Sequence, residues 1–296
     1  KKVSDGEYNA QLEAFNKQFE EHTKKIEEFK ANHPEADEGL INRKVGLYPW
    51  PPPLGRKSFM RPSGLYHTML KKIVPYAVKG VIFYQGESDV EKPDIYGLLF
   101  SKMIQSWRDD WNNPELPFLF TQITYFGNVS SSEESSIADG EEWAILREQQ
   151  RLVADSVENT AMAVITDCGR IDNIHPVDKK PVGERLALLA KAKTYGQNIE
   201  CHGPVYRDIE VQGNRAIVHF DHAASGLMAK GGELKGFEIC EEDRNFVKAI
   251  ATIKDNAVEA YAEKIKTPVA VRYGWANYME VNLHNKEGLP ASPFRT

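Results

Sequence analysis

Residues 79–89 read KGVIFYQGESD, an apolar run that ends in a short polar stretch. Bulky β-branched and aromatic residues between a glycine and a polar turn predict a buried strand over 79–85. Similar apolar runs occur at 117–124 (PFLFTQIT) and 160–167 (TAMAVITD). Strands separated by helices indicate a parallel sheet with helical crossovers, which is an α/β fold. Helical patterns of suitable length occupy the intervals, at 63–74, 94–111, 141–156 and 178–195.

The two ends of the chain have a different character. Residues 8–33 place one apolar stripe on a predicted helix, which packs either on its own domain or in a short coiled coil between chains. Beyond about residue 200, short β-rich runs alternate with Gly, Asn and Asp turns, and VQGNRA and IKDNAV have the composition of hairpin tips. We therefore divide the chain into an amphipathic helical segment (1–45), an α/β core (46–200) and an antiparallel β-domain (201–296).

Composition excludes several classes of function. The chain is 41% hydrophobic and 27% charged, as soluble globular proteins are, and its net charge of −6 gives no reason to expect nucleic acid as a partner. No apolar stretch approaches the roughly 18–20 residues that a membrane span needs. Three cysteines make neither a disulfide framework nor a zinc-binding pattern, so buried free thiols are favoured over one disulfide with a spare thiol.

Polar residues follow two of the predicted strands, where α/β sheets bind their ligands. After the first strand, the Gln85 amide and the Gly86 backbone N–H are donors of the kind that stabilise an oxyanion. After the third, Asp172 and His175 lie three residues apart on a loop, and Pro176 keeps that histidine out of the next helix. This spacing lets the carboxylate hold the imidazole through Nδ1, which leaves Nε2 free to act as a base.

Ser88 belongs to the single Gly-x-Ser of the chain, but it is a poor candidate nucleophile. A nucleophile elbow needs Gly-x-Ser-x-Gly, and position 90 is valine. We expect Ser88 to act as a supporting hydroxyl. A glycosidase pair is also disfavoured, because Glu87 and Asp89 are too close in sequence to flank one bond. His202, His219, His222, Cys201 and Asp221 have no standard metal-ligand spacing, so no metal site is predicted.

Several stretches resemble one family. RPSGLYHTMLKKIVPYAVKGVIFYQGESDV, SWRDDW, LREQQ, DNIHPVDKKPVGERLA, GPVY, GFEI, VAVRYGWAN and GLPASPFRT are similar, in this order, to stretches of the sialate O-acetylesterase family of SGNH-type serine esterases. The similarity runs from about residue 45 to the end of the chain. It implies a flavodoxin-like α/β hydrolase core with an additional β-domain. It also implies removal of O-acetyl groups from sugars, sialic acid above all, without a metal or organic cofactor.

The resemblance assigns roles to individual residues. His175 is implied as the base, Asp172 as the residue that orients it, and the Gln85–Gly86 loop with Glu87 as the surroundings of the oxyanion and the substrate. The family's nucleophile lies in a GQSNM-like turn, and this chain contains no such sequence. We therefore expect the serine outside this chain, on an N-terminal companion segment or on a second chain.

Other readings stay open at this point. The same residues suit a xylan or pectin acetylesterase, or a non-catalytic carbohydrate-binding remnant of the fold. The expected partner is an O-acetylated sugar, and a homo-oligomer is compatible with the sequence. The family resemblance suggests a secreted, periplasmic or lysosome-like location.

Overall fold

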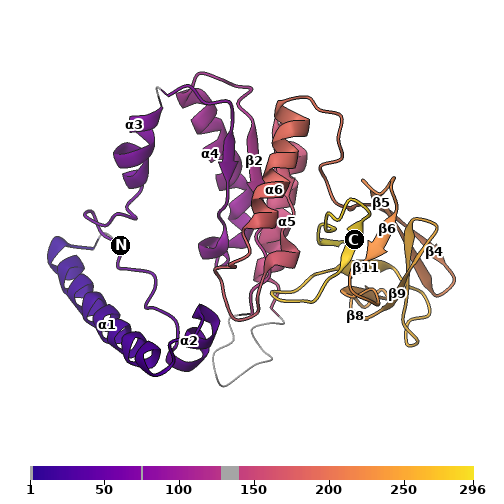
Figure 1. Ribbon diagram of the computed structural model, residues 1–296, viewed down its shortest axis with the longest axis horizontal. Helices are drawn as coiled ribbons and strands as arrows, with labels where there is room; N and C mark the ends of the chain where they lie inside the picture. The colour runs from indigo at the N-terminus through magenta and orange to yellow at the C-terminus, as the bar shows by residue number, and fades with distance from the viewer. Residues whose placement is uncertain (1–2, 75, 128–139) are drawn as a thin grey trace. The chain divides into compact units, whose positions relative to one another are not determined.

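A computed structural model describes residues 3–74, 76–127 and 140–296 (Figure 1). Contacts divide the described chain into two units, one up to Val78 and one from Lys79 onward. Each unit is described by itself below. The predicted domain boundaries near residues 45 and 200 stay predictions. The predicted surface loop at 127–140 lies almost wholly outside the described residues.

The first unit begins with the predicted amphipathic helix, α1 (Asp5–Asn32). Ser4 and Glu7 form a capping box, in which the Ser4 hydroxyl accepts from the Glu7 N–H at 3.2 Å and Glu7 accepts from the Ser4 N–H at 2.9 Å. Tyr8 and Ile26 of the apolar stripe are buried, which anchors the helix at both ends.

Three further helical elements complete this unit. They are α2 (Glu38–Val45), the π-helical turn η1 (Tyr66–Leu70) and α3 (Lys71–Ile73). The last two lie within the helix predicted over 63–74. From residue 46 to residue 63 the proline-rich chain forms no helix or strand, because proline lacks an N–H donor and fixes φ.

The second unit contains the predicted parallel sheet. Strands β1 (Val81–Phe83), β2 (Phe118–Thr121) and β3 (Thr160–Ala163) pair in the order β1-β2-β3. Each begins within two residues of its predicted start. β3 is shorter than predicted, because the chain beyond it turns into a 3-10 helix at Thr166–Cys168, η4.

Helices cover both faces of this sheet. α4 (Tyr96–Asp110) and α5 (Glu142–Ser156) pack on the face that carries Phe120. α6 (Lys180–Leu189) packs on the opposite face, against Leu119 and its neighbours. This is the layering expected of βαβ units. Short helical turns extend the connections at η2 (Glu87–Asp89), η3 (Pro93–Ile95) and η5 (Ala190–Thr194).

The C-terminal third is antiparallel, as predicted. Three sheets are formed within it, in the orders β4-β5-β10-β9, β13-β11-β7-β8 and β12-β6. Both predicted hairpin tips are confirmed, because β4 pairs with β5 across Gly213 and β9 pairs with β10 across Asp255 and Asn256, all at positive φ. The strands are β4 (Val205–Gln212), β5 (Arg215–Asp221), β6 (Leu227–Ala229), β7 (Phe237–Cys240), β8 (Val247–Lys248), β9 (Ile250–Lys254), β10 (Ala257–Tyr261), β11 (Ala270–Tyr273), β12 (Leu283–Asn285) and β13 (Phe294–Arg295).

Strand β1 lies at the edge of the parallel sheet. Among the described residues it pairs with β2 alone. Its neighbours Val81 and Phe83 pack toward α4 and α5, so the intervening Ile82 points to the face that α6 covers only over β2 and β3. The Ile82 side chain is consequently 69% exposed. A free edge with an uncovered apolar side chain is a place where a further strand can pair.

Two other expectations from the sequence can be compared with the structure. Cys168, Cys201 and Cys240 are buried free thiols, as predicted. No helix in the described part of the chain is long and apolar enough to cross a membrane.

Candidate active site

The loop that follows β1 is held by side chains from two helices. The Gln85 carbonyl accepts from the Tyr96 hydroxyl of α4 and from the Gln150 amide of α5, both at 3.1 Å. Gln150 also accepts from the Ile123 N–H at 2.7 Å, just beyond β2. One buried amide therefore fixes the ends of two neighbouring strands relative to each other.

Gly86 occupies a position that requires glycine. Its φ of +153° is one that side chains rarely adopt. A Cβ there would lie 2.8 Å from Ile123 Cγ2 and 3.1 Å from Gln150 Nε2. The tight packing brings the backbone of Gly86 close to the strand ends, directly before η2, and this is where we expected an oxyanion donor.

The Gln85 side chain is ordered by its neighbours. Its Nε2 donates to Asp89 Oδ2 at 2.5 Å, and its Oε1 accepts from the Tyr96 hydroxyl at 3.3 Å. A primary amide has two N–H donors. The contact with Asp89 uses one donor and orients the amide, so the second hydrogen remains available for a ligand.

The loop after β1 meets the loop that carries His175. Lys179 Nζ lies 4.4 Å from the ring centroid of Tyr84 and 3.4 Å from its hydroxyl. Burial raises the pKa of the Glu87 carboxyl, while backbone N–H groups and the charge of Lys179 offset part of the rise. The structure therefore brings together the two loops that carry Glu87 and His175, which were selected from separate strand ends.

The loop after β3 is shaped by contacts close to His175. Asp172 is 8% exposed and its Oδ1 lies 3.1 Å from Arg170 Nε. The buried Asn173 accepts from the His175 N–H at 2.8 Å through Oδ1. The Gly127 N–H donates to the Ile171 carbonyl at 2.9 Å, which ties this loop to the segment that follows β2. His175 itself is exposed, as a base that meets a substrate must be.

Three residues of this cluster were not singled out in the sequence. Gln150 and Lys179 stand in LREQQ and DNIHPVDKKPVGERLA, stretches that carry the family resemblance, but their spacing indicates no chemistry. Arg170 precedes Asp172 by two residues, and only the structure shows that the two side chains pair. Asp172 therefore has a cationic neighbour that the sequence argument did not include.

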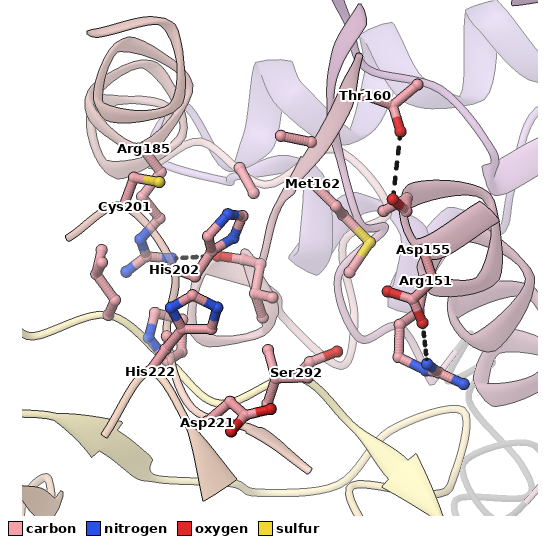
Figure 2. A pocket seen from close by; sticks show the side chains of 18 of the residues that line it. Arg151, Asp155, Thr160, Met162, Arg185, Cys201, His202, Asp221, His222 and Ser292 are labelled. Atoms are coloured by element: carbon pink, nitrogen blue, oxygen red, sulfur yellow. Dashed lines mark hydrogen bonds and ion pairs between the residues drawn. The ribbon is translucent and has the colours of Figure 1, made fainter. Parts of the chain in front are cut away.

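A cavity lies elsewhere in the same unit (Figure 2). It is lined by His202 and His222, for which no metal site was predicted, and by none of the predicted site residues. In the described part of the chain, no group of three His, Cys, Asp or Glu side chains is arranged to hold a metal ion.

Several known proteins are similar to this chain in sequence or in structure. A family described as carbohydrate esterase, sialic acid-specific acetylesterase matches residues 45–191. A sialate O-acetylesterase of Pongo abelii is 28% identical over 253 residues, which are 78% of this chain and 48% of that protein. Its counterpart in Mus musculus is 28% identical over 257 residues, 79% of this chain and 47% of that protein. A crystal structure of a carbohydrate acetylesterase from Xanthomonas citri aligns with a TM-score of 0.71 and 37% identity, over 78% of this chain and 53% of that chain.

Residues 45–191 therefore resemble a carbohydrate esterase in sequence, and the chain is similar in fold to a carbohydrate acetylesterase. The resemblance to the sialate O-acetylesterase family is confirmed, with residues 45–191 matching its acetylesterase domain. The chain spans about half the length of the curated relatives it matches.

Proposed function

We propose that this chain is part of a serine esterase that removes O-acetyl groups from sugars, with O-acetylated sialic acid as the substrate. The proposal assigns residues 46–200 to a flavodoxin-like SGNH core. The family match and the similarity to a carbohydrate acetylesterase at 37% identity support it. The observation that carries it is the contact between the loops after β1 and β3, because Lys179 Nζ lies 3.4 Å from the Tyr84 hydroxyl and 4.4 Å from the centroid of its ring.

The proposed mechanism uses a serine that lies outside these 296 residues. Its hydroxyl attacks the acetyl carbonyl while His175 Nε2 takes the proton. Asp172 stabilises the imidazolium, and the Gln85 amide and the Gly86 N–H donate to the oxyanion. The tetrahedral intermediate collapses as His175 returns the proton to the sugar oxygen. Water then attacks the acetyl-enzyme by the same steps, and acetate leaves.

The free edge of β1 supports this assignment of the serine. A parallel strand added beside β1 would end at the same edge of the sheet as Gln85 and the His175 loop, because parallel strands share their carboxyl ends. A side chain on the same face of that strand would pack beside the exposed Ile82. A serine just beyond that strand would lie next to the proposed oxyanion donors after β1, at the sheet edge where the loop of the proposed base also begins.

The experiment adds a protein segment that could provide the serine. Acetate release from an O-acetylated sialic acid is measured for residues 1–296 alone and after addition of the part of the Xanthomonas citri acetylesterase, about half of that chain, that these residues do not match. We expect turnover only with the added half, and its loss when His175→Ala is introduced. If residues 1–296 alone release acetate as fast as the mixture does, the proposal that the serine lies outside this chain is wrong. Turnover that His175→Ala does not change would contradict the proposed base.

A further inference from the structure

The cavity of Figure 2 has a volume of about 320 Å³. It lies between the outer edge of β3, with parts of α5 and η5, and the start of the β-rich region. Small-molecule sites in proteins have volumes of about 300–1,000 Å³, so the cavity is large enough for a monosaccharide. Its lining includes Met162 of β3, His202 and His222.

Cations outnumber carboxylates in the lining. Two of its three cations have carboxylate partners, since Arg151 pairs with Asp155 at 2.5 Å and Arg185 pairs with Asp167 at 2.5 Å. Lys193 is the third, and within the described ranges it has no ion pair. Its ammonium group therefore adds a positive charge that the surrounding protein does not neutralise.

Asp221, the other carboxylate of the lining, forms no ion pair with Lys193 among the described residues. Asp221 lies 3.8 Å from Arg207, on the neighbouring strand β4. Asp155 is likewise committed to Arg151. An anion that entered the cavity would consequently meet Lys193 without displacing an existing partner.

His202 adds a hydrogen-bond donor to the same lining. Its ring centroid lies 4.8 Å from that of His222, whose Nδ1 is 3.0 Å from Glu200 Oε1. Burial, with help from His222 and Lys193, lowers the pKa of His202 to about 4, against the opposing influence of Glu200. A neutral imidazole has one N–H donor. The His202 ring makes no hydrogen bond within the residues that the structure describes, so this donor is available to a ligand.

The outer edge of β3 offers backbone groups as well. The Gln122 N–H donates to the Ala163 carbonyl at 2.9 Å, so the residues on either side of Ala163 direct their backbone groups away from β2. The Val164 carbonyl already accepts from Arg185 at 2.9 Å. The N–H and C=O of Met162 face the cavity, where they suit the hydroxyl groups of a sugar.

We propose that this cavity is a second binding site, which takes a carboxylate-bearing sugar of monosaccharide size. The carboxylate lies against the Lys193 ammonium and the His202 N–H. The sugar hydroxyls bind the edge of β3 at Met162. The choice of a sugar acid as the ligand rests on the proposed function, whereas the cavity and its charges do not. The site is separate from the cluster around His175, because none of the predicted catalytic residues lines it.

The experiment measures binding without turnover. Isothermal titration calorimetry of residues 1–296 uses N-acetylneuraminate as the probe and N-acetylmannosamine as the neutral comparison. We expect the acid to bind at least tenfold more tightly. Lys193→Met and His202→Gln should each weaken its binding about tenfold, the size of a lost charge-assisted hydrogen bond. Lys191→Met is the matched control, because Lys191 belongs to the same helical turn and does not line the cavity. Circular dichroism checks that each variant is folded.

Each outcome decides the matter. Equal binding of the acid and the neutral sugar, or unchanged binding in folded Lys193→Met, would overturn the site. So would binding that His175→Ala abolishes and Lys193→Met leaves intact, because the sugar would then occupy the candidate active site. Absence of binding at millimolar acid would also overturn it. Intact binding, with no acetate release even after the added part of the Xanthomonas citri acetylesterase, would refute the proposed function alone.

Discussion

Arg185 of α6 holds Asp167 with both terminal nitrogens, at 2.5 Å from Nη1 to Oδ1 and 2.7 Å from Nη2 to Oδ2. Burial opposes ionisation of Asp167, yet hydrogen bonds from Arg185, with His284 Nε2 at 3.7 Å, hold its pKa well below the ordinary range. This pair fixes η4 to α6 and thereby positions the chain that leads to Asp172 and His175. Arg185 is therefore a positioning residue for the loop that carries Asp172 and His175.

Removing Arg185 alone should lower the free energy of unfolding more than removing the charges of both Arg185 and Asp167. Arg185→Met leaves the Asp167 carboxylate partly buried without its cation, which should lower the free energy of unfolding by about 3–5 kcal/mol. The double change Asp167→Asn with Arg185→Met should recover part of that loss. Urea denaturation followed by circular dichroism measures both. A double variant no more stable than Arg185→Met would show that the arginine acts through packing alone.

His175 should be indispensable to catalysis in any preparation that is active. His175→Ala removes the proposed base, and kcat should fall by several orders of magnitude while the fold is retained. Acetate release measures the effect, and an unchanged melting temperature shows that the loss is chemical. Unaltered kcat in this variant would remove His175 from the mechanism.

Variants of Gln85 and Ser88 test two different proposed roles. Gln85 is the proposed oxyanion donor, and Ser88 is expected to be a supporting hydroxyl. Gln85→Ala should lower kcat about 10²–10³-fold, because its amide donates to charge that develops in the transition state. Ser88→Ala should have a much smaller effect, since a hydroxyl contributes only about 0.5–1.5 kcal/mol as a net hydrogen bond. The two variants are compared in the same assay. A Ser88→Ala loss as severe as that of His175→Ala would identify Ser88 as the nucleophile.

The depressed pKa of His202 predicts a specific pH dependence of stability. Between the ordinary value of 6.5 and the folded value of about 4, the unfolded chain binds a proton that the folded chain does not. The free energy of unfolding should therefore fall as the pH drops through this window, by about 3 kcal/mol from His202 alone. Denaturation at pH 7, 5.5 and 4 should show a shallower fall for His202→Gln. Identical pH profiles would exclude the assigned surroundings of this histidine.

The sequence indicates local structure well and long-range packing poorly. The strands at Val81, Phe118 and Thr160 follow from apolar runs, and the hairpin at Asn256 follows from its turn residues. These signals are local, so they survive without knowledge of the tertiary fold. Asp172 and His175 were recognisable because three residues separate them and because a strand precedes them.

Other features depend on segments that are distant in sequence. Gln150 joins the ends of β1 and β2, and nothing in LREQQ reveals which backbone groups it will meet. The cavity at His202 exists because the edge of β3 faces the beginning of the β-rich region. Its histidines have no ligand spacing in sequence, so only packing shows that they face Lys193. The exposed Ile82 is likewise a consequence of strand order.

The location of the nucleophile is the central claim, and labelling tests it most directly. Folded residues 1–296 are incubated with a serine-directed fluorophosphonate probe and examined by intact-mass spectrometry, with the Xanthomonas citri acetylesterase as the positive control. We predict no labelling of this chain, because without the external serine no activated hydroxyl stands beside His175. Stoichiometric labelling of Ser88, or of any other serine in the chain, would contradict the account.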